Sequence, residues 1–307
     1  MNNYTEIPEM TPLMKALKAV HSISGSEFLS EADLERQRSQ MEMFSHLTPS
    51  YAGLLHNQLL IEEIPAVIVS RENTPVSKKI ILYCHGGGFT CGGLSYAQIL
   101  ADKLCHYTGL PVIYFKYRLS PEFPYPAAIN DTISIYNYLM LKGYGAADVL
   151  IAGDSAGGNL ALQLTLELKK TGRMLPKALL LFSPWTDMTM EASSYRTLKD
   201  KDPLLTPEYV RQVRHAYTGG GKDYSDPSFS PLYGDLRGFP PCLIQVGSNE
   251  ILKNDSTDLA KKLTKLECYA KLSIYKGGWH VFQQLPLPMS AKAMEDAAEF
   301  VNSVINY

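Results

Sequence analysis

Short, continuously apolar runs alternate with helix-like stretches through most of this 307-residue chain. Few polar residues interrupt the runs, as is typical of strands covered by helices on both faces of a sheet. Strand and helix repeated in this order predict an α/β fold with a doubly wound, mostly parallel sheet. The predicted strands are Leu59–Ile64, Ala66–Val69, Ile80–Cys84, Val112–Tyr117, Val149–Ala152, Ala178–Phe182, Cys242–Val246 and Lys271–Tyr275, and the predicted helices are Tyr96–Tyr107, Ala127–Leu141, Asn159–Lys170, Ser256–Leu266 and Ala291–Ile305.

Two stretches depart from this alternation. Residues 1–55 carry apolar side chains at helical spacing, with a helix start at Ser30, and predict an N-terminal helical cap before a main domain at 56–307. Residues 186–236 hold a helical piece at Pro207–Tyr217 and a segment rich in Gly, Ser and Pro. This stretch is too long for an ordinary connection, so we expect a second cap segment there.

Charge and cysteine usage exclude several classes of protein. The net charge of -2 gives no electrostatic basis for binding nucleic acid. The first ten residues lack the basic start and apolar core of a secretory signal, and no apolar run is long enough to span a membrane. Five irregularly spaced cysteines without a CxxC pair predict neither a disulfide framework nor a zinc site. We therefore expect a cytoplasmic protein without a metal site.

The strongest local motif is Gly153-Asp154-Ser155-Ala156-Gly157, which fits the G-x-S-x-G pattern. An apolar strand precedes it and a helix follows it. This is the context in which a sharp strand-to-helix turn exposes a nucleophilic serine. A phosphate-binding loop is disfavoured because no lysine follows the glycines and the G-x-G-x-x-G spacing is absent. We predict that Ser155 is a nucleophile.

A second glycine-rich loop, His85-Gly86-Gly87-Gly88, directly follows the predicted strand Ile80–Cys84. Acyl transfer builds negative charge on a carbonyl oxygen, and a glycine run lets backbone N–H groups converge on it. Such HGGG loops act together with the N–H of the residue after the nucleophile. We assign the oxyanion hole to Gly87, Gly88 and Ala156, with His85, Gly86 and Asp154 supporting the loop.

The base and the acid are sought after the serine, in the chain order Ser, acid, His. Only His215 and His280 follow Ser155, and His280 lies on a loop just after the last predicted strand, whereas His215 falls in the cap. Glu250 is the expected acid because it follows a strand. Asp255, one helical turn further on, is expected at a helix start or in a hydrogen-bond network, and Asp202 in the cap is rejected because no strand precedes it.

The chain resembles the hormone-sensitive-lipase-like family of α/β-hydrolases, in particular its bacterial carboxylesterases. The motifs that carry the resemblance are HGGGF at 85–89, YRLSPEFPYPAAIND at 117–131, GDSAGGNLA at 153–161, SPWTD at 183–187, PPCLIQVGSNEIL at 240–252 and WHVF at 279–282. The resemblance implies an α/β-hydrolase fold with a helical cap, a catalytic triad of Ser155, Glu250 and His280, and activity without a cofactor. Members usually carry aspartate where this chain has Glu250.

The expected function is a serine carboxylesterase that acts on small-molecule esters with short to medium acyl chains. Two alternatives stay open: an amide or acyl hydrolase with the same residues, and a non-catalytic ligand-binding protein on a hydrolase scaffold. The second would be expected to have lost a residue of the triad. A metal-dependent hydrolase is disfavoured because no HExxH motif occurs. The sequence leaves the natural ester open, and a homodimer is the alternative to a monomer.

Overall fold

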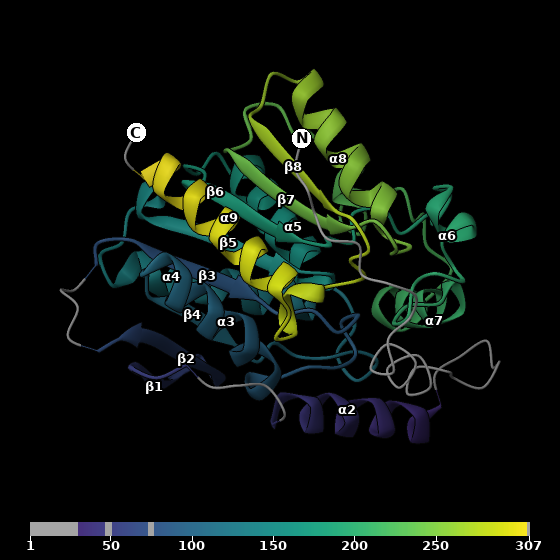
Figure 1. Cartoon of the computed structure of the whole chain (residues 1–307), viewed down its shortest axis with the longest axis horizontal. Helices are drawn as coiled ribbons and strands as arrows, with labels where there is room; N and C mark the ends of the chain where they lie inside the picture. The colour runs from purple at the N-terminus through teal and green to yellow at the C-terminus, as the bar shows by residue number, and fades with distance from the viewer. Residues whose placement is uncertain (1–29, 47–50, 73–76, 306–307) are drawn as a thin grey trace.

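The computed structural model describes residues 30–46, 51–72 and 77–305. Within them, eight strands form one sheet in the order β1-β2-β4-β3-β5-β6-β7-β8 (Figure 1). The pairs β1–β2 and β2–β4 are antiparallel, and the other neighbours are parallel. The strands are β1 (Leu54–Ile61), β2 (Ile64–Arg71), β3 (Ile80–Cys84), β4 (Val112–Phe115), β5 (Val149–Asp154), β6 (Ala178–Phe182), β7 (Cys242–Gly247) and β8 (Ala270–Tyr275). The predicted α/β-hydrolase architecture is confirmed.

Helices cover both faces of the sheet, which explains why the central strands are apolar along their whole length. Alternate side chains of β3 enter opposite cores: Leu82 packs in one and Tyr83 in the other. Helices α3 (Leu94–Thr108) and α9 (Pro288–Ile305) pack on one face (Figure 1). Helices α4 (Ala127–Leu141), α5 (Ala156–Lys170) and α8 (Lys253–Lys265) pack on the other.

The loops that follow β3, β5, β6 and β7 meet at one edge of the sheet. The register places Cys84 beside Gly153 and Asp154 beside Phe182, so these strands end level with one another. In open α/β sheets, ligands bind beyond the carboxyl ends of the strands. This edge therefore carries the predicted site residues.

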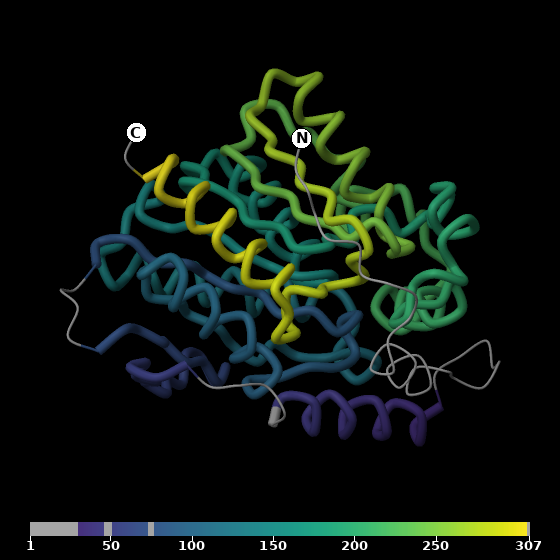
Figure 2. Tube along the Cα trace, in the orientation of Figure 1, coloured from purple at the N-terminus to yellow at the C-terminus, as the bar shows by residue number. Residues whose placement is uncertain are grey.

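The described part of the predicted N-terminal cap is α2 (Glu31–His46), and the helices expected before Ser30 lie outside the described residues. The hydroxyl of Ser30 accepts the N–H of Asp33 at 3.1 Å, as expected for a helix start. The segment between β6 and β7 contains α6 (Ser194–Thr197) and α7 (Pro207–Thr218), which lie together at one end of the molecule (Figure 2). The 3-10 turns are η1 (Ala146–Asp148), η2 (Pro231–Tyr233) and η3 (Phe282–Gln284).

The first strand differs from its prediction. It begins at Leu54, inside the stretch assigned to the cap, and the predicted strand Leu59–Ile64 runs through the turn at Glu62 and Glu63, whose φ angles are 47° and 67°. The reason is that β1 is an edge strand, so polar residues such as Asn57 lie exposed and hide its pattern. The strand predicted as Val112–Tyr117 likewise ends earlier, at Phe115.

The five cysteines are buried and free. Among the described helices, none is both long and apolar enough to cross a membrane.

Candidate active site

Ser155 occupies the sharp turn between β5 and α5. Its backbone angles are φ 52° and ψ -119°, a strained conformation that a non-glycine residue adopts only where its surroundings hold it. A glycine is required close by, because a Cβ at Gly157 would collide with the backbone carbonyl of Cys84. The turn thus brings β3 and the start of α5 into close contact beneath the serine hydroxyl.

The structure brings Ser155, His280 and Glu250 together in one hydrogen-bonded chain. The Nε2 atom of His280 lies 2.9 Å from Ser155 Oγ, and its Nδ1 atom lies 2.8 Å from Glu250 Oε2. His280 follows β8, and Glu250 follows β7. Ser155 and His280 are only 8% and 6% exposed, and Glu250 is fully buried. In this arrangement the imidazole can accept the serine proton while the carboxylate holds the opposite ring nitrogen.

The charges around His280 favour its protonated form. Burial alone lowers the pKa of His280, but the hydrogen bond and the charge of Glu250, assisted by Asp202 and Asp154, raise it more. The pKa of His280 therefore lies above its ordinary value of 6.5. A raised pKa suits a general base that must take up a proton during the reaction.

A serine that the sequence reasoning missed fixes the second oxygen of Glu250. Glu250 Oε1 accepts the N–H of Gly247 at 2.5 Å and the hydroxyl of Ser183 at 2.8 Å. The Ser183 hydroxyl accepts in turn the N–H of Val281, the residue after His280, at 3.1 Å. Ser183 and Val281 both have positive φ angles, 48° and 49°. Ser183 directly follows a central strand, and this position is the signal that could have identified it.

The carboxylate of Asp154 anchors the glycine-rich loop after β3. Asp154 Oδ1 accepts the N–H of Gly86 at 2.8 Å and the hydroxyl of Tyr83 at 2.5 Å. Burial raises the pKa of Asp154 to about 6, and these two hydrogen bonds oppose the rise. His85 lies beneath the same loop, where its ring stacks on Tyr117 with 4.1 Å between centroids. Burial lowers the pKa of His85 to about 4, so its ring is neutral at pH 7.

The backbone N–H groups of the three predicted oxyanion donors are the next feature of the site. Within the described residues, the backbone N–H groups of Gly87, Gly88 and Ala156 donate to no acceptor. The carbonyl of Gly87 accepts the N–H groups of Thr90 and Cys91 at 3.1 and 3.0 Å, which keeps the loop turned. Ala156 is the first residue of α5, where an unpaired N–H and the helix dipole favour negative charge.

Comparison with known proteins agrees with this geometry. A family model described as the alpha/beta hydrolase fold matches residues 81–284, about two-thirds of the chain. The chain belongs to the α/β-hydrolases.

Relatives of this α/β-hydrolase are named as esterases and acetyl-hydrolases. It is 37% identical over 228 residues to an esterase of Acinetobacter venetianus, covering 74% of this chain and 75% of that protein. It is 34% identical over 227 residues to an acetyl-hydrolase of Streptomyces hygroscopicus, covering 73% and 76%. A crystal structure of an esterase from the bacterial hormone-sensitive lipase family matches with a TM-score of 0.89 at 29% identity, covering 98% and 100%. The resemblance to this branch of the family is confirmed.

Both described cap pieces contact the glycine-rich loop of this α/β-hydrolase. From α7, Val213 lies against Gly88, and Tyr217 stacks on Phe89 with 3.7 Å between centroids. From α2, Arg38 donates its Nε–H to the carbonyl of Thr90 at 2.9 Å. Helices α2 and α7, which belong to the two predicted cap segments, therefore both contact the loop that carries Gly87 and Gly88.

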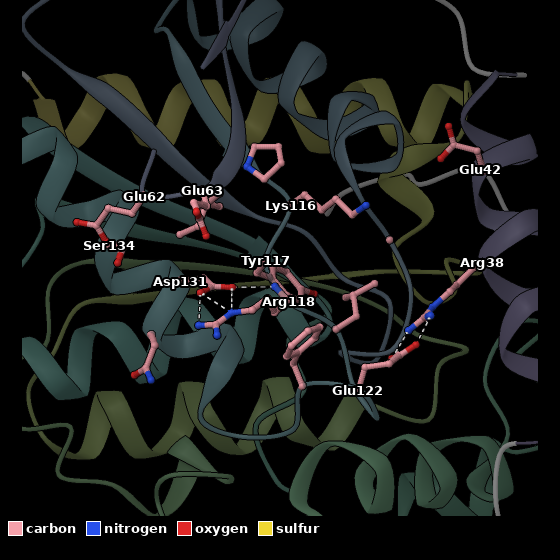
Figure 3. A pocket seen from close by; sticks show the side chains of 16 residues that line it. Arg38, Glu42, Glu62, Glu63, Lys116, Tyr117, Arg118, Glu122, Asp131 and Ser134 are labelled. Atoms are coloured by element: carbon pink, nitrogen blue, oxygen red, sulfur yellow. Dashed lines mark hydrogen bonds and ion pairs between the residues drawn. The ribbon is translucent and has the colours of Figure 1, made fainter. Parts of the chain in front are cut away.

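A groove of about 760 Å³ lies beside the site rather than over it, and neither Ser155 nor His280 lines it (Figure 3). Arg38 pairs with Glu122 at 2.7 Å on one side of the groove, and Arg118 pairs with Asp131 at 2.6 Å on the other (Figure 3). These ion pairs hold α2 and α4 to the segment after β4. The groove thus lies where α2 and α4 meet the segment after β4.

The residues set aside by the sequence reasoning fall in different places. His215 is exposed on α7, and Asp255 is buried in the first turn of α8, where it accepts the N–H groups of Thr186 and Asp187. Asp202 is also buried, and it lies closer to the triad because it accepts the N–H of Ile251, the residue after Glu250. Among the described residues, no three His, Cys, Asp or Glu side chains are grouped so that they could hold a metal ion.

Replacing Gly87 with alanine is expected to lower kcat for ester hydrolysis by about 10²–10³-fold, the usual cost of losing one oxyanion donor. The new Cβ would collide with the carbonyl of Cys91, and φ is +103° at this position, so the loop must move. Gly93→Ala is the matched control, because a Cβ there meets nothing within 4 Å. Steady-state kinetics on p-nitrophenyl butyrate compares the two, and equal rates for both variants would contradict the assignment of Gly87.

Proposed function

We propose that this α/β-hydrolase is a serine carboxylesterase that hydrolyses short- to medium-chain carboxylic esters through an acyl-enzyme intermediate. The observation that carries the proposal is the hydrogen-bonded chain from Ser155 through His280 to Glu250. It lies next to the unpaired N–H groups of the glycine loop. A nucleophile, a base, an acid and an oxyanion site are the parts that acyl transfer requires.

The reaction begins when Ser155 Oγ attacks the ester carbonyl and His280 Nε2 takes the hydroxyl proton. The N–H groups of Gly87, Gly88 and Ala156 stabilise the negative oxygen of the tetrahedral intermediate. The intermediate collapses, and the alcohol leaves with the proton that His280 returns. Water then loses a proton to His280 and attacks the acyl-enzyme, which releases the acid and restores Ser155.

Glu250 keeps His280 productive throughout this cycle. Its Oε2 accepts the Nδ1 proton, so the neutral ring presents an unprotonated Nε2 to the serine. Its Oε1 is fixed by Gly247 and Ser183, so the carboxylate cannot turn away. The longer side chain of glutamate, where related proteins usually carry aspartate, is thereby held in one position.

The proposed substrate is a small ester that enters between the two cap segments and the glycine loop. The names of the two relatives, esterase and acetyl-hydrolase, support acyl esters with short chains. Val213 and the stacked pair of Phe89 and Tyr217 occupy the space beside Gly88, which restricts the room next to the oxyanion site. We infer that the cap segments set the acyl-length limit.

A chain-length series tests the proposal. We expect hydrolysis of p-nitrophenyl acetate and butyrate, with kcat/KM lower by about tenfold or more for palmitate. Acetyl p-nitroanilide serves as the amide counterpart and is expected to react far more slowly than the acetate ester. Faster hydrolysis of the anilide would favour the amidase alternative. No turnover of any ester would contradict the proposal and favour a ligand-binding protein.

A further inference from the structure

Asp202 is a buried carboxylate that the proposed mechanism does not use. It belongs to the segment between β6 and β7 and is only 2% exposed. Its Oδ1 accepts the N–H groups of Leu204 and Leu205 at 2.9 and 3.0 Å. Its Oδ2 accepts the N–H of Ile251, the residue after Glu250, at 2.9 Å. One side chain thus joins the second cap segment to the backbone of the loop that carries the acid.

In the described part of the chain, this carboxylate has no cationic partner. Within the described residues, no lysine, arginine or histidine forms an ion pair with Asp202. Burying an unpaired charge is costly, and backbone donors offset the cost only in part. Burial raises the pKa of Asp202 to about 6, while the charge of His280 and the amides of Leu205 and Ile251 oppose the rise. The bond to the N–H of Ile251 places this carboxylate next to Glu250, whose Oε2 lies 2.8 Å from His280 Nδ1.

We propose that Asp202 is a positioning residue that holds the Glu250–Ile251 backbone in place and stabilises the imidazolium form of His280 with a negative charge additional to that of Glu250. This inference rests on the proposed function, in which His280 becomes charged as Ser155 is deprotonated. Asp202 contacts neither the serine hydroxyl nor the imidazole. It acts through Ile251 and through its electric field, which is strong where water is excluded.

The charges that face His280 come from three elements and all have the same sign. Glu250 approaches from the loop after β7, Asp154 from β5, and Asp202 from the cap segment. Because two of the three charges remain when one is removed, we expect only part of the rise in the pKa of His280 to be lost. Because a negative charge favours imidazolium, its loss lowers the pKa of His280.

The test is the pH profile of kcat/KM for p-nitrophenyl butyrate in wild type and Asp202→Asn. The wild-type kcat/KM is expected to rise with pH as neutral His280 forms. This rising part of the profile, the acid limb, is expected to report a pKa above 6.5. In Asp202→Asn this acid limb is expected to move to lower pH by about 0.5–1 unit, and kcat at pH 8 to fall by about tenfold. Asp202→Glu, which retains the charge, is expected to keep the limb near its wild-type position.

Asp255→Asn is the matched control. Asp255 is similarly buried and accepts the backbone N–H groups of Thr186 and Asp187, yet it is not among the main charges that act on His280. This variant is expected to lose thermal stability without moving the acid limb. If both variants move the limb equally, or if Asp202→Asn does not move it, the proposal is wrong.

A second readout separates this inference from the proposed function. The imidazole nitrogens of His280 are titrated by NMR in ¹⁵N-histidine-labelled protein, with the signal assigned by its loss in His280→Ala. A lower pKa in Asp202→Asn supports the inference even if no ester is hydrolysed, whereas an unchanged pKa contradicts it. Should Asp202→Asn fail to fold, Asp202→Ser takes its place, because a hydroxyl can still accept the N–H of Leu204 or Leu205.

Discussion

Replacing Ser155 with alanine is expected to lower kcat for p-nitrophenyl butyrate by about 10⁶-fold, to the level that the oxyanion site and binding alone sustain. The methyl side chain cannot attack the carbonyl, and His280 Nε2 loses its partner at 2.9 Å. Steady-state kinetics at pH 8, with active-site concentration set by protein absorbance, measures the loss. KM is expected to change little, because the hydroxyl contributes little to ground-state binding.

Ser256→Ala provides the matched control. Ser256 is another buried serine, but it lies on α8 and its hydroxyl has no hydrogen-bond partner among the described residues. This variant is expected to keep wild-type activity. Thermal melting of both variants shows that they are folded. A Ser155→Ala protein that is folded and retains a rate within about tenfold of wild type would remove Ser155 from the mechanism.

Replacing Glu250 with glutamine is expected to lower kcat by about 10⁴-fold, as when the acid of a serine triad becomes an amide. The N–H of Gly247 and the hydroxyl of Ser183 both donate to Oε1. The oxygen of the glutamine amide therefore takes the position of Oε1, because only the oxygen can accept these bonds. The amide nitrogen then faces His280 Nδ1 and donates to it. The ring is forced into the tautomer with its proton on Nε2, which cannot accept the proton of Ser155.

Glu250→Asp separates charge from reach. Aspartate retains the negative charge, but its shorter side chain cannot contact both Gly247 N–H and His280 Nδ1 in the positions they occupy. We expect an intermediate loss of about 10²-fold, typical of a catalytic group misplaced by about 1 Å. Steady-state kinetics at pH 8 compares kcat of the two variants, and we expect Glu250→Asp to be faster than Glu250→Gln. Wild-type activity in Glu250→Gln would show that the acid lies elsewhere.

The parts of the site that could be predicted from the sequence are those with local causes. The turn that holds Ser155 needs only a strand, two glycines and a helix, all within a few neighbouring residues. The glycine run after β3 follows the same logic. His280 and Glu250 could be predicted because parallel strands end at one edge of the sheet, so residues that follow different strands meet. The positions of His280 and Glu250 could therefore be predicted from the order of the strands along the chain.

Other contacts depend on tertiary packing, and no local motif shows which two residues will meet. Ser183 reaches Glu250 across 67 residues, Asp202 reaches Ile251 across 49, and Arg38 reaches Thr90 across 52. The sequence analysis rejects Asp202 as the acid because no strand precedes it. That criterion identifies residues at strand ends, and it does not apply to a segment that reaches the site through tertiary packing. The start of β1 was missed because polar side chains on an edge strand face water.

The most direct test of the account is to trap the acyl-enzyme. The protein is mixed with p-nitrophenyl butyrate, quenched in acid during turnover, digested and analysed by mass spectrometry, with Ser155→Ala treated in parallel. The account predicts one butyryl group on the peptide that contains Ser155 and none on the variant. Turnover with the acyl group on another residue, or equal labelling of Ser155→Ala, would contradict it.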